Sequence, residues 1–112
     1  NMVWLCADVH YTAAHYFDPA QAAYPDFLPF WEFVSGPLHA GSYGPFGADA
    51  TFGVQVRYSR ASPVRGASPA AGFQFFGEVA IDPDSGCLTV QLCDVSGSVL
   101  HTEVIAPHPP CV

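Results

Sequence analysis

The chain has 112 residues, half of them hydrophobic and only 12% charged, and its formal net charge is −7. This length suits one domain. Lysine is absent and the arginines number three, which excludes nucleic-acid binding through a basic patch. No apolar run approaches the roughly 20 residues of a transmembrane helix, and no signal peptide is visible, so we expect no membrane contact. The low charge indicates a large apolar surface.

The first half of the chain predicts short elements, because ten glycines and eleven prolines are spread along the sequence. The apolar run 3–7 predicts a buried strand, and residues 11–16, with two adjacent alanines, predict a turn of helix. A short helix is expected to begin at Pro19. The segment 29–37, "PFWEFVSGP", predicts a strand closed by a turn, and the glycine-rich residues 38–50 predict a loop.

The middle of the chain alternates in polarity and then loses all periodicity. Residues 51–58, "TFGVQVRY", place apolar side chains on one face and polar ones on the other, which is typical of a half-exposed strand. Residues 59–72 are rich in serine, proline and glycine, and this composition predicts a flexible loop.

The last third predicts a three-stranded antiparallel meander. Residues 73–82, 87–95 and 99–105 alternate in polarity and are joined by two tight turns. Three prolines end the meander, since proline cannot donate to a sheet, and residues 106–112 form a tail. The sequence therefore predicts a mainly β fold of about six strands with one or two short helices.

The four cysteines do not predict a disulfide framework. Cys87 and Cys93 are six residues apart in one predicted strand, roughly 20 Å if extended, which is too far for a bond. No C-x-x-C pair supports a structural zinc site. We expect Cys6, Cys87 and Cys93 to be free thiols that pack in the interior.

Asp8 and His10 follow the first predicted strand and are the leading candidates for chemistry. Ligands commonly bind beyond the carboxyl ends of strands, and both side chains can face one side of an extended segment. A carboxylate and an imidazole together suit iron, zinc or manganese, and the carboxylate also suits calcium. An alternative remains open, in which Asp8 caps a turn and His10 is an ordinary half-buried histidine.

Other polar residues are weaker candidates. We expect His15 and His39 to be incidental, and His101 and His108 to face solvent. Glu32 lies among aromatic residues, so its carboxylate must have a partner, and we expect backbone amides to provide it. No G-x-S-x-G, P-loop, H-E-x-x-H or G-x-G-x-x-G motif is present, which leaves serine-nucleophile and nucleotide-loop chemistry without support.

Three blocks of the sequence resemble the PhoD-like alkaline phosphatases and phosphodiesterases. The stretch "VWLCADVHYTAA" is similar to that family's G-D-V-H-Y element, with Ala7 in place of the usual glycine. "PFWEFVSGPLHAGSYGP" resembles its F-W-E-F-V block almost residue for residue. "FQFFGEVAIDPDSGCLTVQLCDVSGSVLHTEVI" is similar to its strand-rich C-terminal end.

This resemblance implies a fold, an activity and cofactors. The family belongs to the calcineurin-like metallophosphoesterases, in which two sheets pack face to face with helices outside and metals lie at the strand ends. Its members hydrolyse phosphomonoesters and phosphodiesters with a metal-activated hydroxide, use iron and calcium, and are often exported, which implies a periplasmic or secreted location. Asp8 would be a metal ligand, and His10 would lie against the metals or the substrate phosphate as a catalytic residue.

The resemblance also implies that much of such an enzyme is missing. The family's upstream Asp, Cys, Tyr and Asn ligands do not occur in these residues, so we expect residues 1–112 to be the C-terminal fragment of the enzyme. The missing N-terminal half and a phosphate ester would then be its partners. We expect the isolated chain to bind no metal tightly and to be inactive. The alternative is a non-catalytic β-rich interaction module, which self-associates as a homo-oligomer through an exposed apolar face.

Overall fold

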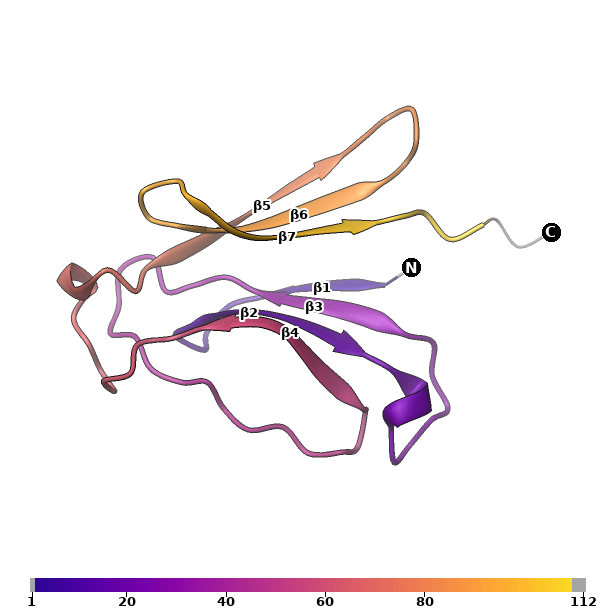
Figure 1. The fold of residues 1–112 in the computed structure, drawn as a ribbon, viewed down its shortest axis with the longest axis horizontal. Coiled ribbons are helices and arrows are strands. Elements are labelled where there is room, and N and C mark those ends of the chain that lie inside the picture. Colours follow the sequence, from indigo (N-terminus) through magenta and orange to yellow (C-terminus); the bar gives the residue numbers. More distant parts are fainter. Residues whose placement is uncertain (1, 110–112) are drawn as a thin grey trace.

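The computed structural model describes residues 2–109, which form seven strands and two short 3-10 turns (Figure 1). These are β1 (Val3–Cys6), β2 (Thr12–Phe17), η1 (Pro19–Gln21), β3 (Phe30–Val34), β4 (Val54–Arg60), η2 (Pro69–Ala71), β5 (Phe75–Ile81), β6 (Leu88–Asp94) and β7 (Val99–Ile105). The prediction of a mainly β fold is confirmed. The described chain has one strand more than the six that the sequence predicted.

The first sheet has the order β1-β3-β2-β4. β1 pairs with β3 in parallel, with Cys6 opposite Val34, whereas β2 is antiparallel to both of its neighbours. Because this pair is parallel, β1 and β3 end at the same edge of the sheet. The segments that follow these two strands, residues 7–11 and 35–46, therefore start side by side.

The prediction of a helical turn at residues 11–16 is wrong, because Thr12–Phe17 is the strand β2. Two small side chains, Ala13 and Ala14, are fully buried on β2, which lies between β3 and β4. Pairing on both edges satisfies the strand's backbone, and the Thr12 hydroxyl donates a hydrogen bond to the Val34 carbonyl at 2.9 Å. Tertiary pairing here overrides the helix preference of alanine.

The boundaries of the fourth strand also differ from the prediction. β4 begins at Val54 and not at residue 51, because residues 51–53 form a turn, and it continues to Arg60. The first two residues of the predicted loop 59–72 thus belong to a strand, and Pro69–Ala71 forms η2 within that loop. The short helix expected at Pro19 is present as η1, whose start is capped by the Asp18 carboxylate.

The second sheet is the predicted antiparallel meander, with the order β5-β6-β7. Its central strand β6 places Val90 and Leu92 in the interior, as the alternation of polarity indicates. Both connections are local turns in which an aspartate accepts hydrogen bonds from the following residues. Asp82 binds the backbone of Asp84, and Asp94 binds the backbone of Ser96.

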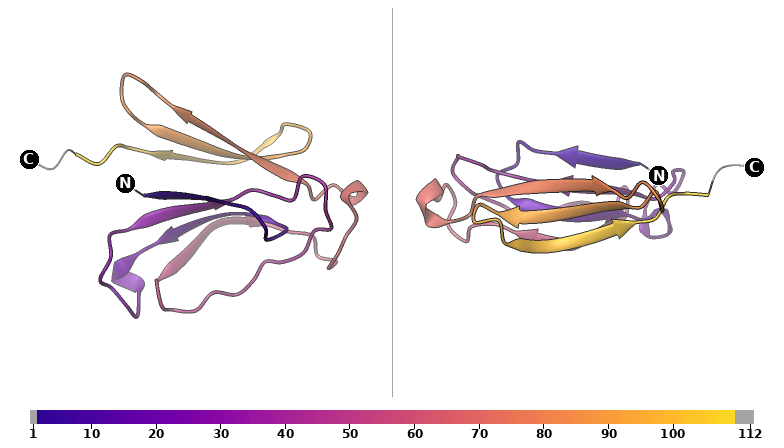
Figure 2. Two further views of the ribbon diagram at one scale, coloured as in Figure 1. Left: turned by 180° about the vertical axis from the view of Figure 1, so that it is seen from behind. Right: turned by 90° about the horizontal axis from the view of Figure 1, so that it is seen from above.

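The two sheets lie one over the other and share one apolar core (Figures 1 and 2). Its centre is a cluster of four buried residues, two from each sheet: Ala14, Phe33, Val90 and Leu92. The two 3-10 turns lie beyond the strand ends and cover neither sheet face (Figure 1). Residues 2–109 therefore form two β layers without a helical layer. None of their helices is long and apolar enough to cross a membrane.

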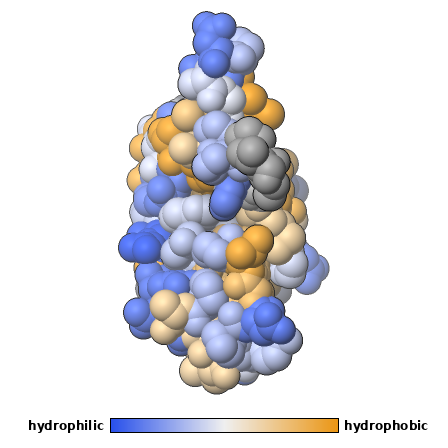
Figure 3. All heavy atoms as spheres, turned by 90° about the vertical axis from the view of Figure 1, so that its right-hand side faces the viewer, coloured by the Kyte–Doolittle hydropathy of each residue, from blue (hydrophilic) through white to orange (hydrophobic). Residues whose placement is uncertain are grey.

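Apolar side chains also reach the surface of the described residues. In Figure 3 they form patches between polar residues on the side of the molecule that the view presents. Trp4 is 47% exposed and Val56 is 60% exposed, and both lie on strands of the first sheet. The exposed apolar surface inferred from the low charge is thus present.

For the residues that the structure describes, the prediction of free thiols is confirmed, but Cys6 and Cys87 are only half-buried. Cys6, Cys87 and Cys93 are free thiols, and Cys93 is buried in β6. Cys111 lies outside the described residues. Burial raises the pKa of the Cys93 thiol, and the nearby Glu78 and Asp94 charges raise it further.

The core prediction concerns Leu92, which has no exposed surface. Replacement of Leu92 by alanine should lower the free energy of unfolding by about 2–5 kcal/mol, because it leaves a cavity between the sheets. Urea unfolding followed by tryptophan fluorescence measures this change. Leu38→Ala is the matched control, since Leu38 is 67% exposed and its loss should cost under about 0.5 kcal/mol. Equal losses from the two variants would contradict this core.

Candidate functional site

Asp8 lies two residues beyond the end of β1, in a tight turn formed by residues 7–10. Its backbone has a φ of 71°, the left-handed region that aspartate tolerates better than most residues. The side chain is exposed, and its carboxylate makes no hydrogen bond to any residue between 2 and 109. The alternative in which Asp8 caps a turn is therefore not supported, and the carboxylate is open to a ligand.

His10 lies in the same turn and is half-buried against the loop that follows β3. Its Nδ1 is 2.5 Å from the carbonyl oxygen of Gly41. A carbonyl can only accept a hydrogen bond, so Nδ1 must carry the proton and donate it. The other ring nitrogen, Nε2, has no hydrogen-bond partner within the described chain. Metal-binding histidines commonly donate one ring N–H to a carbonyl and coordinate through the other nitrogen.

The loop 35–46 also makes hydrogen bonds to the backbone carbonyl of His10. The Ser42 hydroxyl and the Tyr43 amide both donate to the His10 carbonyl oxygen, at 3.0 Å and 3.1 Å. Ser42 is fully buried, and the Tyr43 ring packs against the imidazole at 4.7 Å between centroids. These contacts fix the position of His10 in spite of its place in a turn.

The path of this loop requires a glycine at position 44. The residue has a φ of 119°, and a Cβ atom there would lie 2.5 Å from a ring carbon of Tyr11. Only glycine allows the loop to pass so close to the Tyr11 ring in that conformation. The ring is itself buried, and burial raises the pKa of the Tyr11 hydroxyl.

Glu32 and His15 form a pair that the sequence analysis did not predict. The Glu32 carboxylate is 2.8 Å from His15 Nδ1, and both side chains are mostly buried. Glu32 was expected to bind backbone amides, and this expectation is wrong, because its partner is the His15 side chain. The expectation that His15 is incidental to the site stays a prediction. The two residues are direct partners across β2 and β3. Reading residues 12–17 as a strand antiparallel to 30–34 would have placed them opposite each other.

Cys6 extends this pair on the outer face of the first sheet. Burial raises the pKa of the Cys6 thiol, and the hydrogen bond and negative charge of Glu32 raise it further. A thiol with a raised pKa is a poor nucleophile at neutral pH. Cys6, Glu32 and His15 therefore form a structural polar cluster.

The remaining histidines do not join the site. His39 is exposed, and His108 is exposed as predicted. His101 is half-buried, which corrects the prediction that it faces solvent. Its ring stacks on Tyr58 of β4, in the other sheet, at 5.0 Å, and binds the carboxylate of Glu103, two residues further along β7, at 3.0 Å. Within residues 2–109, no three His, Cys, Asp or Glu side chains gather as a metal site would require.

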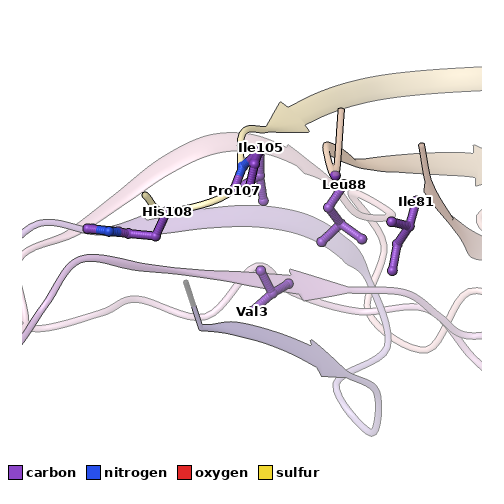
Figure 4. Close-up of a pocket in the computed structure, with 7 residues that line it drawn as sticks. Val3, Ile81, Leu88, Ile105, Pro107 and His108 are labelled. Atoms are coloured by element: carbon purple, nitrogen blue, oxygen red, sulfur yellow. The ribbon is translucent and has the colours of Figure 1, made fainter. Parts of the chain in front are cut away.

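A hollow of about 410 Å³ opens between the two sheets near the end of β7 (Figure 4). Its walls are apolar, with Val3 from the first sheet facing Leu88 and Ile105 from the second. The one titratable side chain in its lining is His108. This hollow lacks the carboxylates that metal binding needs, so it is not the candidate site.

Comparison with known protein families agrees with this geometry. A family model of the PhoD-like phosphatases matches residues 1–92, which include Asp8, His10 and the loop 35–46. The chain therefore belongs to the PhoD-like phosphatase family, and the predicted resemblance is confirmed. Neither the curated proteins nor the solved structures contain a match to this chain. Family membership supports a phosphatase-related function.

The first prediction at the site concerns the His15–Glu32 pair. Glu32→Ala should lower the free energy of unfolding by about 1–3 kcal/mol, because it removes a hydrogen bond and leaves His15 Nδ1 mostly buried. Urea unfolding of Glu32→Ala, His15→Ala and the double variant measures the coupling. Glu78→Ala, on exposed β5, is the control. Strictly additive losses would mean that the pair contributes nothing.

The second prediction concerns the reactivity of Cys6 and Cys93. Because their pKa values are raised, less thiolate is present at a given pH, and iodoacetamide should modify both more slowly in the folded chain than in urea. The rates should rise only at higher pH than in the unfolded chain. Glu32→Gln should accelerate Cys6 and leave Cys93 unchanged, as peptide mapping can show. Equal acceleration of both thiols would indicate general loosening of the fold.

Proposed function

We propose that this chain is the C-terminal part of a metal-dependent phosphatase that hydrolyses phosphate monoesters and diesters. Asp8 binds a metal ion, and His10 lies beside the metals and the reacting phosphate. The support comes from the family match over residues 1–92 and from the two side chains themselves. Asp8 presents an unpaired carboxylate, and His10 presents Nε2, both at the edge where β1 and β3 end.

The observation that carries this proposal is the hydrogen bond from His10 Nδ1 to the Gly41 carbonyl. It selects one tautomer and turns Nε2 away from the loop that holds the ring. Without that bond, the imidazole of a turn residue would rotate and exchange its tautomers. With it, Nε2 of the neutral ring carries a lone pair that can coordinate a metal or accept a proton. Once the ring takes up a second proton, Nε2 can donate to the phosphate or give that proton to the leaving alcohol.

The donors of this chain fit the metals that the family implies. A carboxylate oxygen suits both calcium and iron, and an imidazole nitrogen suits iron. When bound, the metals supply positive charge to the phosphoryl oxygens and lower the pKa of a bound water. The residues of this chain would hold the metal through Asp8 and keep His10 oriented beside it.

Two donors are too few for a complete metal centre. The described residues offer no third ligand near Asp8 and His10. The remaining ligands would come from an N-terminal part of the enzyme, which would also pack against the exposed apolar surface. The isolated chain would then have negligible activity. A periplasmic or secreted location remains a prediction from the family.

A second function from another class has its own supporting observation. Exposed Trp4, Val56 and Phe52, all near 50% or above in exposure, give the first sheet an uncovered apolar surface. Such a surface would let the chain act as a non-catalytic interaction module that forms a homo-oligomer. Light scattering that shows a monomer at high concentration would exclude this alternative.

The test of the proposed function is the substitution Asp8→Asn in the full-length enzyme that contains this sequence. We expect a loss of bound metal and a loss of p-nitrophenyl phosphate turnover greater than the roughly 10–100-fold that an outer-shell substitution causes. Metal analysis and initial rates measure both. Asp26→Asn is the control, because Asp26 is exposed on a loop and carries the same charge.

Two outcomes would contradict the proposal. The first is an Asp8→Asn enzyme that keeps its metal content and its rate. The second is steady turnover of p-nitrophenyl phosphate, or of its bis-ester, by residues 1–112 alone, since this would show that no further ligands are needed.

A further inference from the structure

The positive charge of this chain is confined to Arg57, Arg60 and Arg65 and to the histidines when protonated. Each guanidinium lies over an aromatic ring. Arg57 lies over Tyr16 at 5.4 Å, and Arg60 lies over Phe75 at 6.0 Å. Arg65 lies over Tyr43 at 5.8 Å, and the Tyr43 ring is the one that packs against His10 at 4.7 Å.

The position of Arg65 follows from the backbone contacts of its neighbours. The Gly66 amide donates to the Ser42 carbonyl at 2.9 Å, and the Ser42 amide donates to the Ala67 carbonyl at 3.0 Å. Ser42 is also the residue whose hydroxyl binds the His10 carbonyl. One buried serine therefore links the arginine loop to the histidine turn, although the two are far apart in the sequence.

The guanidinium of Arg65 is also unpaired within the described chain, where the ion pairs are His15–Glu32 and His101–Glu103. Arg60 differs, because the pKa of the Asp94 carboxyl, which is lowered mainly by the hydrogen bond from the Ser96 side chain, is lowered further by the charge of Arg60. The contact of Arg65 with the Tyr43 ring uses none of its N–H groups, and these N–H edges make no hydrogen bond within the described residues. Those edges match the oxygens of a phosphate in a bidentate arrangement.

A hollow of about 240 Å³ lies beside the guanidinium. Its walls include Tyr43, Pro45, Phe46 and Pro63, together with Arg65 itself. These walls combine aromatic and proline rings with polar atoms, and the volume is sufficient for a six-membered ring. The side chain that can bind a phosphate thus adjoins a space that suits an aromatic group.

We propose that Arg65 is the phosphate-binding residue of this chain, and that the adjoining hollow accepts the aromatic alcohol group of an aryl phosphate ester. This inference rests on the proposed function, because it takes the substrate to be a phosphate ester. The net charge of −7 repels a phosphate dianion, so a local unpaired cation is needed to hold one. Arg65 is the arginine whose aromatic partner also contacts His10.

The test is an NMR titration of the 112-residue chain with phenyl phosphate in metal-free buffer. We expect shifts at Arg65, Gly66 and Tyr43, and a weaker apparent affinity for Arg65→Gln by about fivefold, the upper range of an exposed ion pair. Arg57→Gln is the matched control. It removes the same charge from another ring-stacked arginine and should leave the affinity unchanged.

Two further measurements keep the test decisive. Arg65→Lys preserves the charge but not the planar fork, so its affinity should fall between those of the native chain and Arg65→Gln. Methyl phosphate should bind more weakly than phenyl phosphate if the hollow takes the ring. Amide spectra that match the native spectrum outside the loop establish that each variant is folded.

The inference is overturned if Arg65→Gln binds phenyl phosphate as the native chain does, if Arg57→Gln weakens binding equally, or if methyl phosphate binds as well as phenyl phosphate. Its failure is separate from failure of the proposed function. Asp8→Asn tests the metal site in the full-length enzyme, and in metal-free buffer that substitution should not weaken phenyl phosphate binding. Either of the two proposals can therefore be contradicted while the other stands.

Discussion

The parallel pairing of β1 with β3 is the constraint on which the candidate site depends. Parallel neighbours end at the same edge of a sheet, so the turn that carries Asp8 and His10 starts beside the loop that carries Gly41 and Ser42. An antiparallel β1 would send that turn to the opposite edge of the sheet. The hydrogen bonds that orient His10 could not form in that arrangement.

Ser42 connects the three segments that meet at this edge. Its hydroxyl reaches the His10 carbonyl, and its backbone pairs with Gly66 and Ala67. Because Ser42 is fully buried, its polar atoms must be paired within the protein, and these contacts supply the partners. The hydrogen bonds of Ser42 thus hold together the segments whose side chains, His10 and Arg65, both contact the Tyr43 ring.

The two faces of the first sheet lie in different environments. Its inner face packs Phe33 and Ala14 against the meander and supplies the core. Its outer face carries the His15–Glu32 pair among apolar side chains that remain partly exposed. This hydrogen-bonded pair fits one register of β2 against β3, the one in which His15 lies opposite Glu32.

The sequence by itself determined the meander, because strands β5, β6 and β7 are joined by local turns and their alternation is read along neighbouring residues. It also singled out Asp8 and His10, through a motif contiguous in the chain. Only the tertiary structure decided that residues 12–17 are a strand, that Glu32 meets His15, and that His10 donates to Gly41. These contacts join residues 17 and 31 positions apart. Their energy depends on strand pairing that no local pattern of polarity encodes.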